Sequence, residues 1–294
     1  MKYEAIEKLR GQHSVAKMAR ALKVKDSAYY QWRRRQAANI VKQKLEKELV
    51  AKVREAFDEN RQVYGYRKMQ EELAEKDIEI SLYKTRKIMR ENGLFPVVGH
   101  KWRPQRSSKA SGRFLDNLIN QDFKVSAPNK VWAGDITCIK TSLGWVHMAV
   151  VLDLCTKEVL GYKISTRAST ELVKQALADA LISSGRDHTQ KLIFHSDRGT
   201  QYASKSFQKM CEAHNITPSM SAVRNPFDNA VVESFFSSAK REEIYRRKYT
   251  GIDEVRHYLF DYIELFYNRK RRQAHLGYKS PKTYRYMLEA KKAT

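Results

Sequence analysis

Hydrophobic and polar residues follow two different periods along this 294-residue chain. In residues 3–97, apolar residues recur at three- and four-residue spacing, which is typical of helices with one buried face. Between residues 131 and 220, short apolar runs rich in Val, Ile and aromatic residues are typical of β-strands, and helical spacing intervenes. The pattern therefore predicts an all-helical front followed by an α/β domain.

Residues 1–40 are predicted to form a helix-turn-helix DNA-binding module. Ser14 and Asp26 are suitable N-cap residues, and the apolar residues between them are followed by a short turn at Lys23-Val24-Lys25. Three helices are expected, over residues 3–9, 14–22 and 26–35. Arg33, Arg34 and Arg35 would then lie at the end of the recognition helix, where they suit phosphates. A basic helical hairpin that only confers solubility is the alternative.

Residues 41–100 are predicted to form a second, helix-turn-helix-like module. Its helices are expected over residues 42–60, 68–75 and 82–92. Lys84 and Lys87 lie on the last of them, together with Arg86 and Arg90. These four charges are all positive, so phosphate contact is favoured over a merely solvated face. Residues 101–128 are expected to be a basic linker, either along a DNA backbone or free in solvent.

The α/β part is predicted to begin with three consecutive strands, which favour an antiparallel meander. Strands are expected over residues 131–139, 144–153, 158–164, 192–194 and 216–220, and helices over residues 170–183 and 204–214. The C-terminal part, residues 248–294, is expected to hold an amphipathic helix over residues 252–267 and a basic tail. Arg271 and Arg272 lie in that tail between two tyrosines, a composition suited to DNA backbone contact and base stacking.

Charge narrows the range of partners. The chain has 56 Lys and Arg against 33 Asp and Glu, a formal net charge of +23, which indicates a polyanionic partner. Nucleic acid is favoured, and an anionic membrane is the alternative. No apolar run is long enough to span a membrane and no signal-peptide core opens the chain, so a cytoplasmic, nucleoid-associated protein is expected. The three scattered cysteines are expected to be reduced core residues.

Three acids are candidates for one site. Asp135 lies in the middle of a predicted strand, Asp197 follows a strand, and Glu233 lies on a predicted helix whose same side carries Asn229 and Lys240. A buried carboxylate is costly unless it is paired, hydrogen-bonded or bound to metal. Taken singly, each could be an ordinary solvated acid.

The surrounding sequence resembles a known family. Asp197 and Glu233 are separated by 35 residues, and the three acids stand in the segments Trp132-Ala133-Gly134-Asp135-Ile136-Thr137, His195-Ser196-Asp197-Arg198-Gly199-Thr200-Gln201-Tyr202 and Asn229-Ala230-Val231-Val232-Glu233-Ser234-Phe235-Phe236. These resemble the acidic triad of DDE transposases and retroviral-type integrases. The match is most similar to insertion-sequence transposases whose catalytic part is encoded by the second of two reading frames, and it runs over nearly the whole chain.

The resemblance implies an α/β, RNase H-like mixed-sheet catalytic core over residues 129–247, preceded by the all-α modules. It implies that Asp135, Asp197 and Glu233 are the catalytic and metal-binding residues. Hard cations such as Mg²⁺ or Mn²⁺ prefer such oxygen ligands, and two ions could serve an in-line phosphoryl displacement. Lys240 would hold DNA beside the acids, and Arg198 and Asn229 are weaker candidates for the same role. His195 could be a ligand or a proton carrier, but support of the site by hydrogen bonding is favoured, and Asp153 is expected to be structural.

The implied activity is that of a DNA transposase. It would bind transposon terminal inverted repeats, cleave 3′ ends and transfer them to target DNA, as a homo-oligomer and possibly with the first-reading-frame product. The two-His, two-Cys zinc module of retroviral integrases is not expected, because residues 1–130 contain no cysteine. A non-catalytic DNA-binding regulator of its own element is the main alternative, and an RNase H-type nuclease without strand transfer is another.

Overall fold

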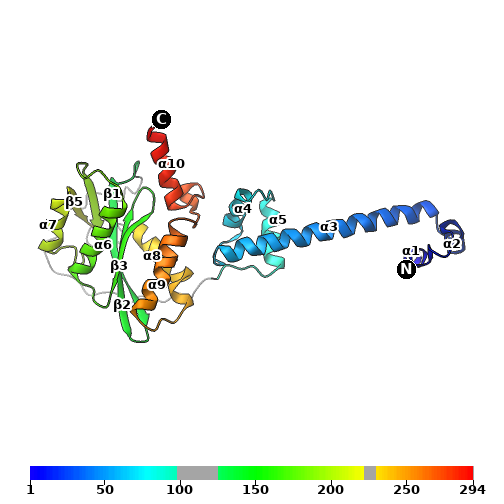
Figure 1. Ribbon diagram of the computed structural model, residues 1–294, viewed down its shortest axis with the longest axis horizontal. Coiled ribbons are helices and arrows are strands. Elements are labelled where there is room, and N and C mark those ends of the chain that lie inside the picture. The colour runs from blue at the N-terminus through cyan, green and yellow to red at the C-terminus, as the bar shows by residue number, and fades with distance from the viewer. Residues whose placement is uncertain (98–124, 222–229, 294) are drawn as a thin grey trace.

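The computed structural model describes residues 1–97, 125–221 and 230–293. An α/β domain lies at one end of an elongated molecule, and a small helical module lies at the other (Figure 1). One long helix, α3 (Asp26–Glu59), connects this module to a second group of helices that contacts the α/β domain. No helix of the described residues is long and apolar enough to cross a membrane.

The distal module consists of α1 (Lys2–Leu9), α2 (Val15–Ala21) and the start of α3. Ile6, Ala19 and Tyr29 form its small buried core, against which the other apolar residues of the predicted pattern pack. A four-residue turn separates α2 from α3, as in a helix-turn-helix. The apolar spacing in the sequence therefore predicted this module correctly.

Two helices expected at residues 26–35 and 42–60 are in fact one. The 34-residue α3 extends over about 51 Å at 1.5 Å per residue. Residues 36–41, Gln-Ala-Ala-Asn-Ile-Val, contain no Gly or Pro, so nothing in them ends a helix. The prediction that Arg33, Arg34 and Arg35 end a recognition helix is wrong, and the boundary expected at residues 40/41 falls inside α3.

The second module packs on the α/β domain. It comprises the C-terminal half of α3, α4 (Tyr66–Glu75) and α5 (Leu82–Glu91). Its buried side chains, including Val53, Phe57 and Met69, belong to the same hydrophobic cluster as one face of the sheet. The second module and the α/β domain, which the sequence predicts as separate units, therefore share one hydrophobic core. The C-terminal segment covers the apolar face of the second module. The expected linker, residues 101–128, lies almost wholly outside the described residues.

The α/β domain is built on a five-stranded mixed sheet of order β3-β2-β1-β4-β5. The first three strands form the predicted antiparallel meander, and β1 pairs with β4, and β4 with β5, in parallel. The strands are β1 (Val131–Thr141), β2 (Gly144–Asp153), β3 (Val159–Ser165), β4 (Leu192–Ser196) and β5 (Ile216–Met220).

Helices cover both faces of this sheet. On one face lie α6 (Thr170–Ser183) and α7 (Lys205–Ala213), which pack against Ala149 and Val151 of β2. On the other face lie α8 (Ala230–Glu242) and α9 (Ile252–Phe260), against Met148, Val150 and Leu152 of the same strand. Successive β2 residues thus enter opposite cores, as the two-residue period requires. This is the mixed-sheet α/β core that the resemblance implied.

The C-terminal segment differs in detail from the expected single helix. After α9, residues Asp261–Tyr267 form a π-helix, followed by a short 3₁₀ turn and by α10 (Pro281–Ala293), which the sequence reading did not predict. Pro281 is favourable at the first position of a helix, where its missing N–H costs nothing. Tyr262, Ile263 and Phe266 of the π-helix are buried in the shared core.

Candidate active site

Strand pairing brings two of the three acids together. The parallel register pairs Ala133 with His195 and Gly134 with Ser196, so its continuation sets Asp135 beside Asp197. The two acids lie on the α8 face of the sheet, because residues of the same parity, such as Ala133 and Ile139, enter the core on that face. Asp135 lies within β1 and Asp197 directly after β4, as the sequence predicted.

Glu233 reaches the same place from α8. This helix packs against β1, and Glu233 lies in its first turn. The charges of Asp197 and Glu233 raise the pKa of Asp135, and the charge of Lys240 lowers it. These four side chains therefore form one electrostatic cluster at the carboxyl end of β4, and the sequence predicted all four.

Carboxylates dominate this cluster. Burial, followed by repulsion from Asp197, raises the pKa of Asp135 to about 8 from its ordinary 3.8. Burial also raises the pKa values of Asp197 and Glu233. Among the described residues, no group of three or more His, Cys, Asp or Glu side chains could hold a metal ion as they stand. Asp197 and Glu233 are exposed, and Oδ1 of Asp197 accepts from the backbone N–H of Gly199 at 3.0 Å. The three carboxylates repel one another and are hard oxygen donors, which suit a divalent cation.

Replacing Asp135 with Asn is expected to stabilise the protein in the absence of metal. Between pH 3.8 and about 8, the folded protein retains a proton on Asp135 that the unfolded chain has lost, so its stability falls as pH rises. The advantage of the variant should therefore be small near pH 4 and complete above pH 8. After allowance for solvent screening, we expect the free energy of unfolding of Asp135→Asn to exceed that of wild type by about 1 kcal/mol, which corresponds to about 2–4 °C in Tm.

Thermal unfolding in EDTA across this pH range measures the effect. Asp253→Asn, at an exposed acid of α9, is the matched control and should show no such trend. Equal Tm values for wild type and Asp135→Asn above pH 8 would contradict the repulsion inferred here.

Small and aromatic residues support the acids from below. A Cβ atom on Gly134 would lie 2.5 Å from the Phe194 ring, so only glycine allows this close approach next to Asp135. Tyr202 is buried against the same ring, and the charges of Asp135 and Asp197 help to raise its pKa well above 10. The hydroxyl of Tyr202 is therefore a neighbour of the acids. The sequence analysis assigned no role to Tyr202, although it is the last residue of the segment that carries Asp197.

His195 has the supporting role that was expected. Its ring is fully buried, with Nδ1 3.0 Å from the hydroxyl of Ser219 and Nε2 3.3 Å from that of Ser221. Both ring nitrogens are therefore bonded to β5 and the residue after it. The ring fixes the strand end from which Asp197 projects.

Asp153 is structural, as predicted. It is fully buried, and it accepts hydrogen bonds from the backbone N–H groups of Asn129, Cys155 and Thr156 at 2.7–2.9 Å. The bonds from Cys155 and Thr156 fix the turn between β2 and β3, and the bond from Asn129 ties the residues before β1 to that turn. The cysteines are free, but only Cys155 and Cys211 are core residues, since Cys138 is exposed on β1.

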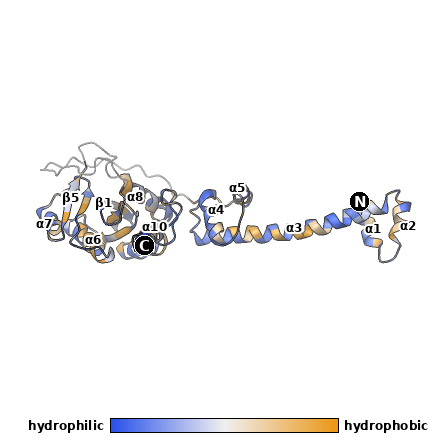
Figure 2. Ribbon diagram, turned by 90° about the horizontal axis from the view of Figure 1, so that it is seen from above, coloured by the Kyte–Doolittle hydropathy of each residue, from blue (hydrophilic) through white to orange (hydrophobic). Residues whose placement is uncertain are grey.

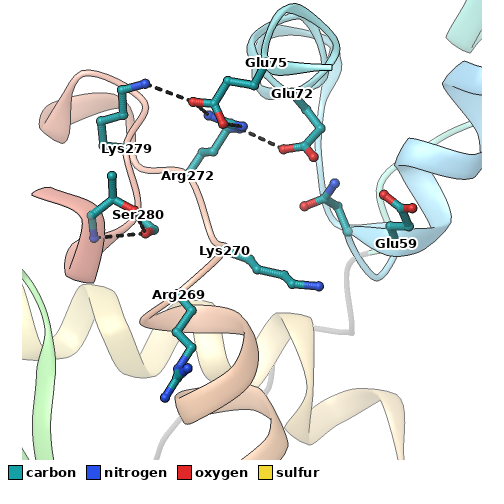
Figure 3. Close-up of a pocket in the computed structure, with 10 residues that line it drawn as sticks. Glu59, Glu72, Glu75, Arg269, Lys270, Arg272, Lys279 and Ser280 are labelled. Carbon is teal, nitrogen blue, oxygen red and sulfur yellow. Dashed lines mark hydrogen bonds and ion pairs between the residues drawn. The ribbon is translucent and has the colours of Figure 1, made fainter. Parts of the chain in front are cut away.

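Two predicted DNA contacts are instead internal ion pairs. Arg271 is buried and donates to both carboxylate oxygens of Glu242 at 2.6 and 2.7 Å. Arg272 is also buried and donates to Glu72 at 2.9 Å and to Glu75 at 2.5 and 2.8 Å (Figure 3). Because these groups already have partners, the structure replaces the expected phosphate contacts with two connections of the C-terminal segment, through Arg271 to α8 and through Arg272 to α4.

The remaining basic candidates lie on the surface or at its edge. Arg34, Arg35, Lys84 and Lys87 are exposed, and Arg33 is half-buried with Glu7 as an ion partner at 3.5 Å. Arg198 donates from Nε to the carbonyl oxygen of Ser221 at 2.7 Å. Asn229 lies outside the described residues.

Family models match the α/β domain and the helical module next to it. The integrase core domain family matches residues 125–226, a second integrase core domain description matches residues 214–281, and an HTH-like domain matches residues 44–102. Solved structures that align include the HTLV-2 integrase catalytic core domain in complex with magnesium in its trimeric form. That chain is 18% identical, with a TM-score of 0.43, over 54% of this chain and 98% of that chain.

Full-length similarity is found among bacterial insertion-sequence proteins. Transposase InsF for insertion sequence IS3A of Escherichia coli (strain K12) is 36% identical over 285 residues, covering 97% of this chain and 98% of the relative. The insertion element IS600 uncharacterized 31 kDa protein of Shigella sonnei is 33% identical, covering 91% and 97%. The mixed sheet, the matched integrase core and this near-complete similarity confirm the predicted RNase H-like fold and DDE polynucleotidyl transferase class: the chain belongs to the IS3 family of insertion-sequence transposases.

Proposed function

We propose that Asp135, Asp197 and Glu233 are the catalytic residues of this transposase and that together they hold Mg²⁺, or Mn²⁺ in its place, as a pair of ions. The observation that carries the proposal is their convergence, from two adjacent strands and one helix, into a cluster whose like charges need a cation. All donors are carboxylate oxygens, the ligands that these hard cations prefer.

The proposed reactions are cleavage of the 3′ end of the element and transfer of that end to target DNA. Bound divalent ions would lower the pKa of an attacking hydroxyl or water and stabilise the leaving oxygen. Lys240, which shares a cluster with Asp135, would hold the adjacent phosphate by charge. The buried side chains beneath the acids would keep their separation fixed while DNA binds.

We assign DNA contact to the exposed basic residues. Arg34 and Arg35 on α3 and Lys84 and Lys87 on α5 have their charged groups in solvent, while Arg33, Arg198 and Asn229 are secondary candidates. The partners are the terminal inverted repeats and target DNA, within the bacterial nucleoid, with the first-frame product as a further candidate. We expect each phosphate contact to appear in the salt dependence of binding.

Cleavage and joining of labelled transposon-end DNA test the proposal. The wild-type chain should nick the 3′ end and join it to a second duplex with Mg²⁺ or Mn²⁺, and neither product should form in EDTA. Binding without cutting under every metal condition, with and without the first-frame product, would favour the regulator instead. The family assignment and the intact acids favour the enzyme.

We further propose that α3 mediates homo-oligomer assembly on DNA. Residues 34–48 of this helix are all exposed, including Val41 at 59% and Leu45 at 61%. Figure 2 shows that hydrophobic and hydrophilic residues alternate along α3. In an antiparallel pair of α3 helices centred on Val41, Leu45 faces Ala37 of the second copy, and Glu48 faces Arg34. The apolar stripe and the flanking charges are therefore complementary to themselves.

Val41→Glu/Leu45→Glu is expected to reduce self-association at least tenfold without loss of folding, because both side chains are in solvent in a single copy. Sedimentation with and without end DNA measures the change. Ile182→Glu, at an apolar residue of α6 that is 83% exposed, is the control. Unchanged association of the double variant would exclude this surface.

A further inference from the structure

A cavity that no assigned function uses lies on the flank of α8. Its lining comes from four separate segments: Lys68 of α4, Lys157 of the β2–β3 turn, Ser234 of α8, and Arg271, Gln273 and His275 of the C-terminal segment. Ser234 follows Glu233 by one residue, about 100° around the helix. The cavity is therefore adjacent to the proposed catalytic face, and residues of both the HTH-like domain and the integrase core line it.

Positive charge is in excess around this cavity. Burial, then repulsion from Arg271, lowers the pKa of Lys68 to about 8, although the charge of Glu242 acts in the opposite direction. Burial and the charges of Lys157, Arg271 and Lys68 lower the pKa of His275. Glu242 is already held by both guanidinium donors of Arg271. The cationic groups that line the cavity outnumber the acidic groups available to neutralise them, which suits an anion.

A buried donor without a partner also lines the cavity. Gln273 is 5% exposed, and its amide nitrogen has no hydrogen-bond partner. Burial raises the pKa of the adjacent Tyr267 phenol, and the nearby amide of Gln273 only partly opposes that shift. A buried N–H group left unpaired costs about 1–3 kcal/mol. An acceptor oxygen in the cavity would remove that cost, and Lys68, His275 and Ser234 could donate to other oxygens of the same group.

We propose that this cavity binds a backbone phosphate of the DNA that lies across the active site. The inference rests on the proposed DNA transposase function and adds to it a specific contact. Phosphate oxygens accept from Lys68, Gln273 and His275, so the second helical module positions DNA in register with Glu233. A cluster that merely joins α4 to the core would instead leave DNA affinity unaffected by these side chains.

Two variants test the proposal in the full chain, with a duplex bearing the terminal repeat and EDTA present so that no cleavage occurs. Lys68→Gln/His275→Gln should weaken binding about tenfold and reduce the slope of log K against log salt by about 1. Lys209→Gln/His188→Gln removes the same residue types from exposed positions elsewhere in the core and should change neither quantity.

Gln273→Glu separates a ligand site from a structural cluster. The new carboxylate would itself neutralise the cationic groups, so this variant should raise the Tm of the free protein yet weaken DNA binding about tenfold. Retained affinity and salt slope in both variants, when wild type binds and cuts the end normally, would overturn the phosphate site and leave the transposase proposal standing. Absence of metal-dependent cutting by wild type would overturn the proposed function first, and this inference with it.

Discussion

Glu233→Gln is expected to reduce nicking and strand joining by about 10³-fold or more while leaving DNA affinity nearly unchanged. The substitution preserves the shape of the side chain but removes one of three charged oxygen donors. A weaker cation site raises the barrier of a reaction that depends on metal to stabilise both attacking and leaving oxygens. Glu233 is exposed in the first turn of α8, so its replacement disturbs no buried contact.

Rates of single-turnover nicking and joining, measured beside end-DNA affinity in EDTA, test this expectation. Glu212→Gln, the same change at an exposed glutamate next to the end of α7, is the matched control and should retain full activity. Activity of Glu233→Gln within a few-fold of wild type would remove Glu233 from the catalytic set. Equal loss in both variants would point to damage unrelated to the acids.

Arg271→Ala should lower the free energy of unfolding by about 3–5 kcal/mol, the cost of leaving a buried charge without its partner. Glu242 is buried, and besides both donors of Arg271 it accepts from the Tyr262 hydroxyl at 2.9 Å. The guanidinium of Arg271 holds the pKa of Glu242 below its usual range despite burial. Urea unfolding followed by circular dichroism measures the loss.

Lys270→Ala removes a neighbouring basic residue that is exposed, and its effect should stay within about 0.5 kcal/mol. Arg271→Met/Glu242→Leu removes both charges together, so it should recover most of the stability lost in Arg271→Ala. A stable Arg271→Ala protein with weakened DNA binding would reinstate the phosphate contact expected from the sequence. A loss of stability comparable in Lys270→Ala would show that the basic run acts as a whole.

The connection between α4 and the C-terminal segment has a consequence for the molecule as a whole. Tyr64 donates from its hydroxyl to the carbonyl oxygen of Lys270 at 3.0 Å and accepts from the backbone N–H of Arg272 at 2.8 Å. Arg61 adds an ion pair to Glu243 at 3.2 Å. The HTH-like domain is therefore fixed to the integrase core, whereas the distal module is separated from it by an exposed stretch of helix.

The sequence by itself predicted the five strands, most of the helices and the grouping of the three acids. The apolar, β-branched run of β2 and the four-residue spacing in α8 depend only on local geometry, so they are visible without a structure. Asp135, Asp197 and Glu233 could be grouped because their spacing resembles a known family. The same local patterns gave the distal module, whose small core is built from residues close in the chain.

Tertiary structure alone decided which basic residues are available to DNA. Arg271 and Arg272 look like the exposed Arg269 and Lys270 beside them, and only the position of Glu242, Glu72 and Glu75, distant in the chain, makes them internal. The continuity of α3 also escaped prediction, since a helix needs no buried face where its ends are anchored by separate cores. Hydrophobic periodicity is a local property of the sequence, so it can be recognised without a structure. The ion-pair partner of a charged residue is distant in the chain, so it is set only when the chain folds.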